Sequence, residues 1–350
     1  MNILVTAAGG GVGQAILNSL ARCNGHRVVA VDPYGSAAGL RFENVAQRYL
    51  VPLAADGGYS ADILRICEVE KIGLIFPGSD PELLPLAHLR PMLLRDYDTE
   101  VMVGSPHAVA LARDKLESMR YLNSSPCIAA DTIPLLSYHD LFALDLPCVI
   151  KPRWGSNSVG VAVLHTPLDC TRWWAEYQQT ERPAEMVVQE YLEGAEYTCT
   201  VLIGRGSRIL DSLELWREPR LGPKLLTISR RSVDIPRLRE AARQAALAFC
   251  KVTGDGGFDT MQGAVNVQAR WDKNRGPVIF EVNPRFPGST NICTGLGMNG
   301  PKMLAEHFGD EVPPWVISLE AHRIGWTVYR TLAEVYLPPE AESVSYVPYV

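Results

Sequence analysis

Four side chains that carry carbonyl or carboxylate oxygens recur at a spacing of two residues in two neighbouring apolar segments. The segments cover residues 264–269 and 277–283, and the four side chains are Asn266, Gln268, Glu281 and Asn283. Two apolar segments around a short polar stretch predict an antiparallel hairpin with its loop at residues 273–276. In the register that closes this loop, Gln268 faces Glu281 and the two asparagines face each other. All four side chains then share one face, because side chains alternate along a strand.

The opposite face of the predicted hairpin is apolar. It consists of Val265, Val267, Val278, Phe280 and Val282. Buried polar groups without partners are costly, so a cluster of four such side chains needs an occupant. A hard cation such as Mg²⁺ prefers carboxylate and amide oxygens, usually together with substrate phosphates. Arg285 follows two residues after Asn283 and is expected to point at the same site. An ordinary exposed polar face is the alternative interpretation.

Composition and charge argue against several classes of protein. The formal net charge is −6, whereas broad nucleic-acid binding depends on clustered positive charge. No run of 18 apolar residues occurs, and the chain starts directly in a strand-like segment, so we expect no membrane span and no signal peptide. The eight cysteines are scattered singly, which is typical of reduced thiols. We therefore expect a cytoplasmic protein with small-molecule partners and without nucleic-acid or membrane partners.

Residues 1–105 alternate between short apolar runs and helical patterns. The apolar runs cover residues 2–6, 27–31, 47–51, 72–77 and 100–103, and the helical patterns cover residues 12–22, 60–70 and 81–94. This alternation predicts an α/β domain with a Rossmann-like parallel sheet and covering helices.

A glycine-rich turn follows the first predicted strand. Gly9, Gly11 and Gly13 precede or open the first helical pattern, and Asp32 ends the second strand, as in a dinucleotide fingerprint. The fingerprint is incomplete, because Gln14 stands where its third glycine belongs. The turn can instead let the first helix pack closely or hold an anion of the substrate. We favour these roles over NAD binding, which stays open as an alternative.

A second candidate site surrounds Lys151. The apolar segment 146–152 predicts a strand with this lysine near its end, and a loop rich in Gly, Ser and Asn follows at residues 154–161. A lysine can place a positive charge on phosphates while the N–H groups of such a loop approach them closely. The loop is not a Walker A motif, since no Gly-Lys-Ser/Thr follows it. A plain glycine hairpin between two strands is the alternative.

These segments together resemble the ATP-grasp superfamily, in particular the branch that includes the large subunit of carbamoyl phosphate synthetase. The resemblance is carried by Lys151 with its loop, residues 189–196, Gln268 and Glu281-x-Asn283-Pro-Arg285. It implies that Gln268, Glu281 and Asn283 hold Mg²⁺ or Mn²⁺. It also implies that Arg285 contacts phosphate, and that an ATP-grasp fold follows the Rossmann-like domain.

The resemblance also implies which residues bind ATP. Glu190 and Leu192 would contact adenine through main-chain groups, Gln189 would lie near its amino group, and Glu196 would accept from the ribose hydroxyls. Lys115, in a helix expected to run from residue 105 through 116, would reach the phosphates; a solvated helix charge is the alternative. The complete expected set is Lys115, Lys151, Gly155, Ser156, Ser158, Gly160, Gln189, Glu190, Leu192 and Glu196.

Four regions follow from this organisation. Residues 1–105 form the Rossmann-like pre-ATP-grasp domain. Residues 106–190 form the small ATP-grasp subdomain with the lysine strand and glycine loop, and residues 191–310 form the C-terminal subdomain with the metal site. Residues 311–350 are a tail to which we assign no chemistry.

The acceptor side is predicted from a local excess of positive charge. Between residues 205 and 239 nine basic residues stand against four acidic ones, although the whole chain is acidic. We expect the irregular middle of this segment to line the acceptor pocket and to recognise a substrate with a negative charge beyond the activated carboxylate. The candidates are Arg217, Arg220 and Arg230, with Gly288 and Ser289 after the hairpin.

The resemblance implies an ATP- and Mg²⁺-dependent, ADP-forming ligase that activates a carboxylate as an acyl phosphate for attack by an amine. Lys151 and Arg285 would be its catalytic residues, acting on developing negative charge. Two alternatives remain open: an NAD(P)-dependent oxidoreductase that uses the N-terminal domain, and a non-catalytic nucleotide-binding protein. Both substrates and the oligomeric state stay open, with a homodimer as one option.

Overall fold

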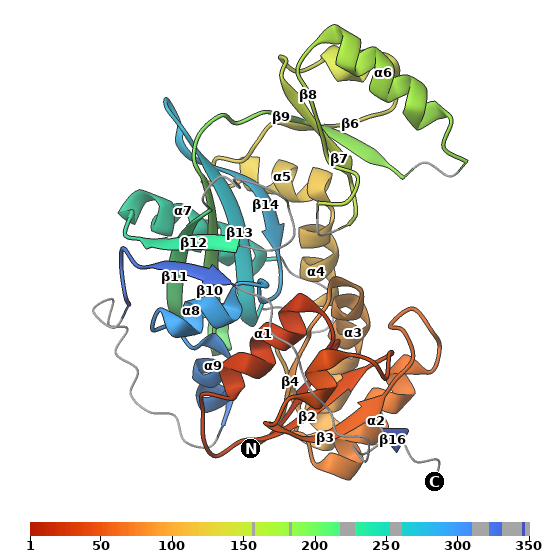
Figure 1. Cartoon of the computed structure of the whole chain (residues 1–350), viewed down its shortest axis with the longest axis vertical. Coiled ribbons are helices and arrows are strands. Elements are labelled where there is room, and N and C mark those ends of the chain that lie inside the picture. Colours follow the sequence, from red (N-terminus) through yellow and green to blue (C-terminus); the bar gives the residue numbers. More distant parts are fainter. Residues whose placement is uncertain are drawn as a thin grey trace.

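The computed structural model describes residues 1–155, 158–181, 184–217, 228–252, 261–309, 322–330 and 345–346. These residues form three sheets (Figure 1). A parallel N-terminal sheet lies at one end of the molecule, a small antiparallel sheet lies at the other, and a large antiparallel sheet lies between them. In the part of the chain that is described, no helix has the length and hydropathy needed to cross a bilayer.

The N-terminal sheet has the parallel arrangement that the sequence predicts. Its strand order is β16-β3-β2-β1-β4-β5, with β1 (Asn2–Val5), β2 (Arg27–Asp32), β3 (Val45–Leu50), β4 (Leu74–Phe76), β5 (Glu100–Val101) and β16 (Ser345–Tyr346). Helices α1 (Gly11–Leu20), α2 (Tyr59–Glu70) and α3 (Asp80–Tyr97) and the 3₁₀ helix η1 (Ala38–Arg41) follow its strands. The predicted α/β class is therefore confirmed. The strand β16, which pairs with β3, comes from the tail and was not expected in this sheet.

One predicted helix is two helices in the structure. Helix α4 (Pro106–Arg113) ends at Asp114, whose φ of −84° and ψ of 104° are extended, and α5 (Lys115–Asn123) begins next. The Asp114 carboxylate accepts hydrogen bonds from the N–H groups of Leu116 and Glu117 and so caps α5. The expected continuous helix was wrong, because this aspartate starts a new helix with a changed direction.

The small sheet carries the lysine strand. Its order is β6-β9-β7-β8, with β6 (Thr132–Pro134), β7 (Cys148–Pro152), β8 (Ala162–Leu164) and β9 (Met186–Glu190). Helix α6 (Pro167–Gln178) and the 3₁₀ helix η2 (Tyr138–Phe142) accompany it. Cys148 and Ile150 of β7 are buried in the same cluster as Cys170 of α6. The alternate residues of β7 thus anchor the strand on α6 and leave Lys151 on the other side.

The large sheet contains the predicted hairpin. Its order is β14-β13-β10-β11-β12-β15, with β10 (Glu196–Ile203), β11 (Ile209–Arg217), β12 (Ile228–Val233), β13 (Gly263–Asp272), β14 (Gly276–Asn283) and β15 (Thr327–Arg330). The 3₁₀ helix η3 (Arg205–Ser207) joins β10 to β11, and α7 (Pro236–Phe249), α8 (Thr290–Gly295) and α9 (Gly300–Phe308) are its helices. Val265 and Val267 of β13 pack in one cluster with Ala245 and Phe249 of α7. Helix α7 therefore covers the apolar face of the hairpin.

The apolar face of β14 differs from the predicted one because the hairpin contains a β-bulge. Gln268 pairs with Glu281, but Ala269 pairs with Ile279, so Phe280 has no partner in the ladder. A bulge shifts the alternation of side chains along a strand. Ile279 therefore packs with the α7 cluster, while Val278 and Phe280 belong to a cluster on the other side with Leu192.

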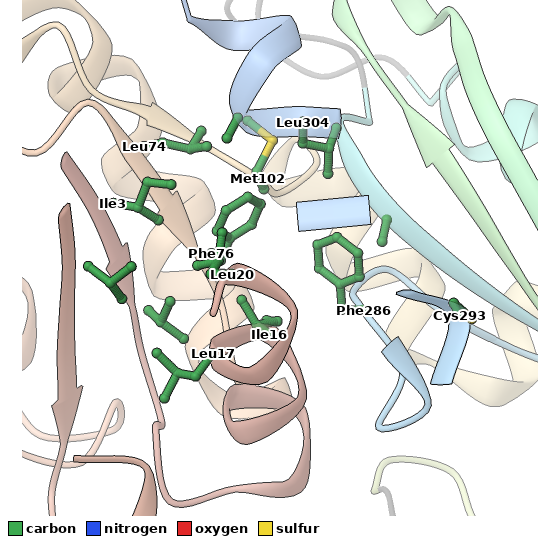
Figure 2. Close-up of a cluster of buried hydrophobic side chains, with 14 of the residues drawn as sticks. Ile3, Ile16, Leu17, Leu20, Leu74, Phe76, Met102, Phe286, Cys293 and Leu304 are labelled. Atoms are coloured by element: carbon green, nitrogen blue, oxygen red, sulfur yellow. The ribbon is translucent and has the colours of Figure 1, made fainter. Parts of the chain in front are cut away.

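A single apolar cluster joins the N-terminal sheet to the large sheet (Figure 2). Ile16 and Leu17 of α1 and Phe76 of β4 pack in it with Phe286 and with Leu304 of α9. The rings of Phe76 and Phe286 meet edge to face, with centroids 5.8 Å apart. This cluster fixes the position of the first sheet relative to the segment that follows β14.

We expect Phe286→Ala to lower the free energy of unfolding by about 3–5 kcal/mol, because it removes a buried ring and leaves a cavity. Urea denaturation would measure the loss. Leu136→Ala is a matched control, since this leucine is 82% exposed and its truncation should change stability by less than about 0.5 kcal/mol. A loss below about 1 kcal/mol for Phe286→Ala would show that the cluster does not hold the two sheets together.

Candidate active site

The hairpin brings the three predicted metal ligands together. The register pairs Gln268 with Glu281 and Asn266 with Asn283, as expected. The Asn283 amide donates to the Glu281 carboxylate over 3.2 Å. The Asn266 amide oxygen is occupied by the Thr198 hydroxyl, which donates to it over 2.7 Å. Among the described residues, no basic side chain forms an ion pair with Glu281, so its carboxylate keeps acceptor capacity for a cation.

The β-bulge connects this hairpin to the lysine strand. Because Phe280 is unpaired in the ladder, its carbonyl oxygen is open to other donors. It accepts a hydrogen bond from Lys151 Nζ over 3.1 Å and one from Gln189 Nε2 over 3.3 Å. Lys151 Nζ also donates to Gln189 Oε1 over 2.8 Å, and Gln189 donates to Thr132 over 2.9 Å. Sequence reasoning identified both polar residues but not the bulge that joins them.

Lys151 is almost completely buried, with 4% of its surface exposed. Burial lowers the pKa of its ammonium group to about 8, because desolvation disfavours the charged form. The Glu281 carboxylate opposes this shift and the Lys115 ammonium adds to it, so these three charged groups interact electrostatically. The predicted phosphate lysine thus belongs to the same electrostatic site as the predicted metal carboxylate.

Lys115 lies beside these residues at the start of α5. Its ammonium group donates to the Gly155 carbonyl over 2.6 Å, and its main-chain N–H donates to the Arg153 carbonyl. Burial lowers its pKa, while Glu281 and Asp80 raise it. The alternative of a solvated helix charge does not fit this environment. The helix break at Asp114 explains the position, because Asp114 also holds the Arg153 guanidinium through contacts of 2.6 to 3.0 Å.

The glycine loop is described only in part, and Ser156 lies outside the described residues. Gly155 and Gly160 have φ angles of +140° and +73°, which favour glycine, and Ser158 has a φ of +59°. All three are exposed. The loop therefore presents its main chain to solvent beside Lys115.

The segment between β9 and β10 is held by the hairpin. The Glu190 carboxylate forms a bidentate ion pair with Arg275 at 2.7 and 2.9 Å. The Leu192 carbonyl accepts from Arg270 over 2.9 Å. Gly194 approaches Trp271 so closely that a Cβ on it would lie 1.7 Å from the Trp271 carbonyl oxygen. Only glycine fits there, so the segment is fixed against β13.

Glu196 stands in a row of arginines across the large sheet. The register places Arg270, Glu196, Arg217 and Arg230 opposite one another on β13, β10, β11 and β12. Arg270 contacts Glu196 at 2.7 Å, and Arg217 forms an ion pair with it as well. Arg217 also donates to Gln268 Oε1 over 2.8 Å. The structure thus places Arg217 between Glu196, the expected ribose residue, and Gln268, an expected metal ligand. Arg270 is a site residue that was not predicted from the sequence.

The other expected substrate residues are less close to this centre. Arg230 is buried on β12 next to Arg217. Arg220 lies outside the described residues. Ser289 is buried just before α8, and Gly288 precedes it. The middle of residues 205–239 was expected to be irregular, and this expectation was partly wrong. Strand β11 extends to Arg217 and β12 begins at Ile228.

Arg285 reaches the first sheet. Its guanidinium pairs with the Asp80 carboxylate, Nε to Oδ1 at 2.9 Å and Nη2 to Oδ2 at 2.7 Å. Asp80 was not among the expected site residues. The sequence feature that indicates Asp80 is its position directly after Ser79, because serine is typical of the residue before the first turn of a helix.

A cavity of about 120 Å³ collects several of these side chains. Its lining includes Lys115, Gly155, Glu281, Asn283 and Asp80. A larger cavity of about 660 Å³ lies elsewhere, between residues 144–147, Glu190, Tyr191 and the hairpin turn. We place the chemistry at the smaller one, because its lining combines the predicted metal ligands Glu281 and Asn283 with Lys115.

Two family models match separate parts of the chain. Residues 3–100 match the PylC-like N-terminal domain, and residues 182–324 match an ATP-grasp family described as acting in the biosynthetic pathway with the Ter operon. Residues 182–324 belong to the ATP-grasp superfamily, and this segment carries the predicted metal ligands. The narrower resemblance to carbamoyl phosphate synthetase stays a prediction.

Relatives of known structure or activity agree with this membership. The chain is 25% identical to D-alanine–D-alanine ligase of Gloeobacter violaceus over 82% of this chain and 85% of that one. It is 28% identical to the Ruegeria ligase of the same name over 52% of this chain, a match that spans only 59% of the ligase. L-amino acid ligase from Bacillus licheniformis superposes with a TM-score of 0.69 at 15% identity, covering 96% of this chain and 80% of that one. N5-carboxyaminoimidazole synthetase from Staphylococcus aureus superposes with a TM-score of 0.66 at 17% identity, covering 89% and 78%.

The buried ammonium of Lys151 predicts how stability depends on pH. Between about pH 8 and pH 10.5 the unfolded chain binds a proton that the folded protein does not, so this lysine makes stability rise with pH. We expect the free energy of unfolding of the wild type, relative to Lys151→Met, to increase by about 2–3 kcal/mol from pH 7 to pH 10.

Chemical denaturation at several pH values measures this difference, and other titrating groups cancel in it. Lys302→Met is the control, because the Lys302 side chain is 47% exposed and its variant should show no such trend. A constant difference between wild type and Lys151→Met would mean that burial does not lower the pKa of Lys151 in the folded protein.

Proposed function

We propose that this protein is an ADP-forming ligase that uses ATP to join a carboxylate to an amine. One observation carries the proposal: Gln268, Glu281 and Asn283 present oxygens on one strand pair within the electrostatic reach of the buried Lys151 and the half-buried Lys115. The γ-phosphate of ATP is transferred to a carboxylate oxygen, which breaks its bond to ADP and forms an acyl phosphate. The amine then attacks the acyl carbon, and phosphate leaves.

The donor set fits a divalent cation. One carboxylate and two amide oxygens are hard ligands, and Mg²⁺ usually combines such ligands with waters and substrate phosphates. Glu281, Asn283 and Gln268 would hold Mg²⁺ or Mn²⁺, which neutralises phosphate charge when bound. Gln268 must exchange its contact with Arg217 for the metal, and we propose that Arg217 then turns to an anion.

The protein's own groups act mainly through charge and position. Lys151 and Lys115 place ammonium groups on the phosphates, and the main chain of Gly155, Ser156, Ser158 and Gly160 covers them. Gln189, Glu190 and Leu192 contact adenine, and Glu196 orients the ribose. Arg285 binds negative charge on the reacting carboxylate or phosphate. The proposed regions are residues 1–105, 106–190 and 191–310, as the sequence predicts.

The alternatives have no support in the relatives. In the glycine turn, the Asp32 carboxylate accepts from Gly9 N over 2.8 Å and from Tyr34 N over 2.9 Å. Its oxygens are thus committed to the protein main chain, which disfavours the ribose role of a dinucleotide-binding domain. We also propose a cytoplasmic location and small-molecule substrates.

We expect Glu281→Ala to reduce substrate-dependent ADP release by at least about a thousandfold with an unchanged fold, because metal charge supplies much of the stabilisation of phosphoryl transfer. A coupled ADP assay with pooled carboxylates and amines measures this. Glu68→Ala, at an exposed position of α2 in the N-terminal domain, is the control and should keep wild-type turnover. Near-normal turnover of Glu281→Ala would refute the metal assignment.

The arginine row motivates an anionic substrate. Arg217 and Arg230 stand next to each other on β11 and β12 at the edge of the site. We expect Arg217→Gln and Arg230→Gln to raise the KM of the charged substrate by at least about tenfold. Arg95→Gln, on an exposed side chain in α3, is the control. If neither variant changes that KM, the two arginines stabilise the sheet and do not bind the substrate.

A further inference from the structure

Asp80 comes from the N-terminal domain, yet its carboxylate contacts a residue 205 positions further along the chain. The partner is Arg285, directly after the metal hairpin, and the two contacts of 2.9 and 2.7 Å are bidentate. The Arg285 side chain is 10% exposed and the Asp80 side chain 18%. Such a pair fixes the guanidinium plane, and its position inside the molecule means that water competes weakly for it.

The hydrogen bonds of Arg285 leave part of its guanidinium available. An arginine has five N–H donors in a planar fork. Two of them bind Asp80, and one on Nη1 binds the Phe286 carbonyl over 3.0 Å. Among the described residues no other acceptor binds the guanidinium, and the two donors that remain, one on Nη1 and one on Nη2, suffice for a contact with one carboxylate or phosphate group.

Asp80 itself is held rigidly. It is the first residue of α3, and Glu82 in the same turn accepts from Ser79 over 2.9 Å, from Thr6 over 2.8 Å and from Tyr59 over 3.1 Å. These contacts tie the first turn of α3 to the end of β1 and to α2. On the other side, Phe286 is packed against Phe76 in the cluster of Figure 2. Both partners of the ion pair are therefore anchored to the first sheet.

The pair also adjoins the candidate active site. Asp80 lines the cavity of about 120 Å³ together with Lys115, Glu281 and Asn283. The main-chain N–H of Arg285 donates to the Asn283 carbonyl over 2.8 Å. The main chain of Arg285 is thus joined to that of a predicted metal ligand, while its guanidinium is joined to the N-terminal domain.

We propose that Asp80 is a positioning residue that holds Arg285 so that its two remaining N–H donors face the reacting carboxylate and its phosphate. The proposal rests on the proposed function. It makes the N-terminal domain a part of the catalytic geometry, because that domain sets the angle of the guanidinium at the site.

A double-mutant cycle tests whether Asp80 acts through Arg285. We expect Asp80→Ala to lower kcat by about ten- to a hundredfold and to change the KM for ATP by less than about twofold. In an Arg285→Ala background the same change should lower kcat by less than about twofold, since the group it positions is gone. Asp80→Asn, which keeps one acceptor oxygen, should recover part of the activity.

The matched control is Asp96→Ala on the same helix, because Asp96 forms an exposed ion pair with Arg95. It should leave kcat unchanged. Thermal unfolding of each variant shows whether it is folded, and Asp80→Asn replaces Asp80→Ala if the latter is not. The positioning role is refuted if Asp80→Ala lowers kcat equally in both backgrounds, or if it has no effect on kcat.

A second measurement separates this proposal from the ligase function. Calorimetric titration with inorganic phosphate should show binding to the wild type, at least about tenfold weaker binding to Asp80→Ala and to Arg285→Ala, and no further loss in the double variant. If no carboxylate–amine pair releases ADP but this pattern holds, the ligase proposal fails and the role of Asp80 stands. If phosphate binds wild type and Asp80→Ala equally, or binds neither, Asp80 does not position an anion-binding arginine.

Discussion

The burial of the Lys151 ammonium is the constraint around which the candidate site is arranged. A charged group with 4% of its surface exposed is stable only when polar partners and an opposite charge compensate for lost water. The Gln189 amide and the Phe280 carbonyl supply the partners, and the Glu281 carboxylate supplies the charge. These residues come from both antiparallel sheets, so the lysine also joins the small sheet to the large one. The site is built at that junction.

The same compensation explains the arginines around the segment between β9 and β10. Glu190 ends β9 and Glu196 begins β10. Each is paired with an arginine from the hairpin, Glu190 with Arg275 and Glu196 with Arg270. Arg270 also binds main-chain carbonyl groups of the segment. The end of the hairpin away from the turn therefore carries the predicted metal ligands, and the end near the turn carries Arg270 and Arg275. One strand pair thus contributes residues to both parts of the site.

The N-terminal domain is joined to this arrangement by two different interactions. Apolar packing around Phe76 and Phe286 buries side chains of both domains in one cluster. The Asp80–Arg285 pair adds direction, since a bidentate contact defines the orientation of a planar group in a way that apolar packing does not. Together they explain how a Rossmann-like domain can contribute to a site whose ligands all lie on a hairpin.

Local sequence patterns were sufficient to predict the features that depend on neighbouring residues. Alternation in residues 264–283 was enough to predict the pairing of Gln268 with Glu281, because a short loop permits few registers. The alternating runs of the first 105 residues likewise predicted a parallel sheet, since each strand and helix has its own hydrophobic period.

Which distant residues meet depends on the tertiary fold and could not be predicted from local patterns. The bulge at Phe280 breaks the alternation, and Lys151 and Gln189 of another sheet bind the carbonyl that it frees. The placement of Arg217 on Gln268 and Glu196, and of Asp80 on Arg285, depends on how strands and domains pack. The local sequence pattern does not identify the ion-pair partner of a charged side chain, because that partner depends on proximity and burial in the folded protein.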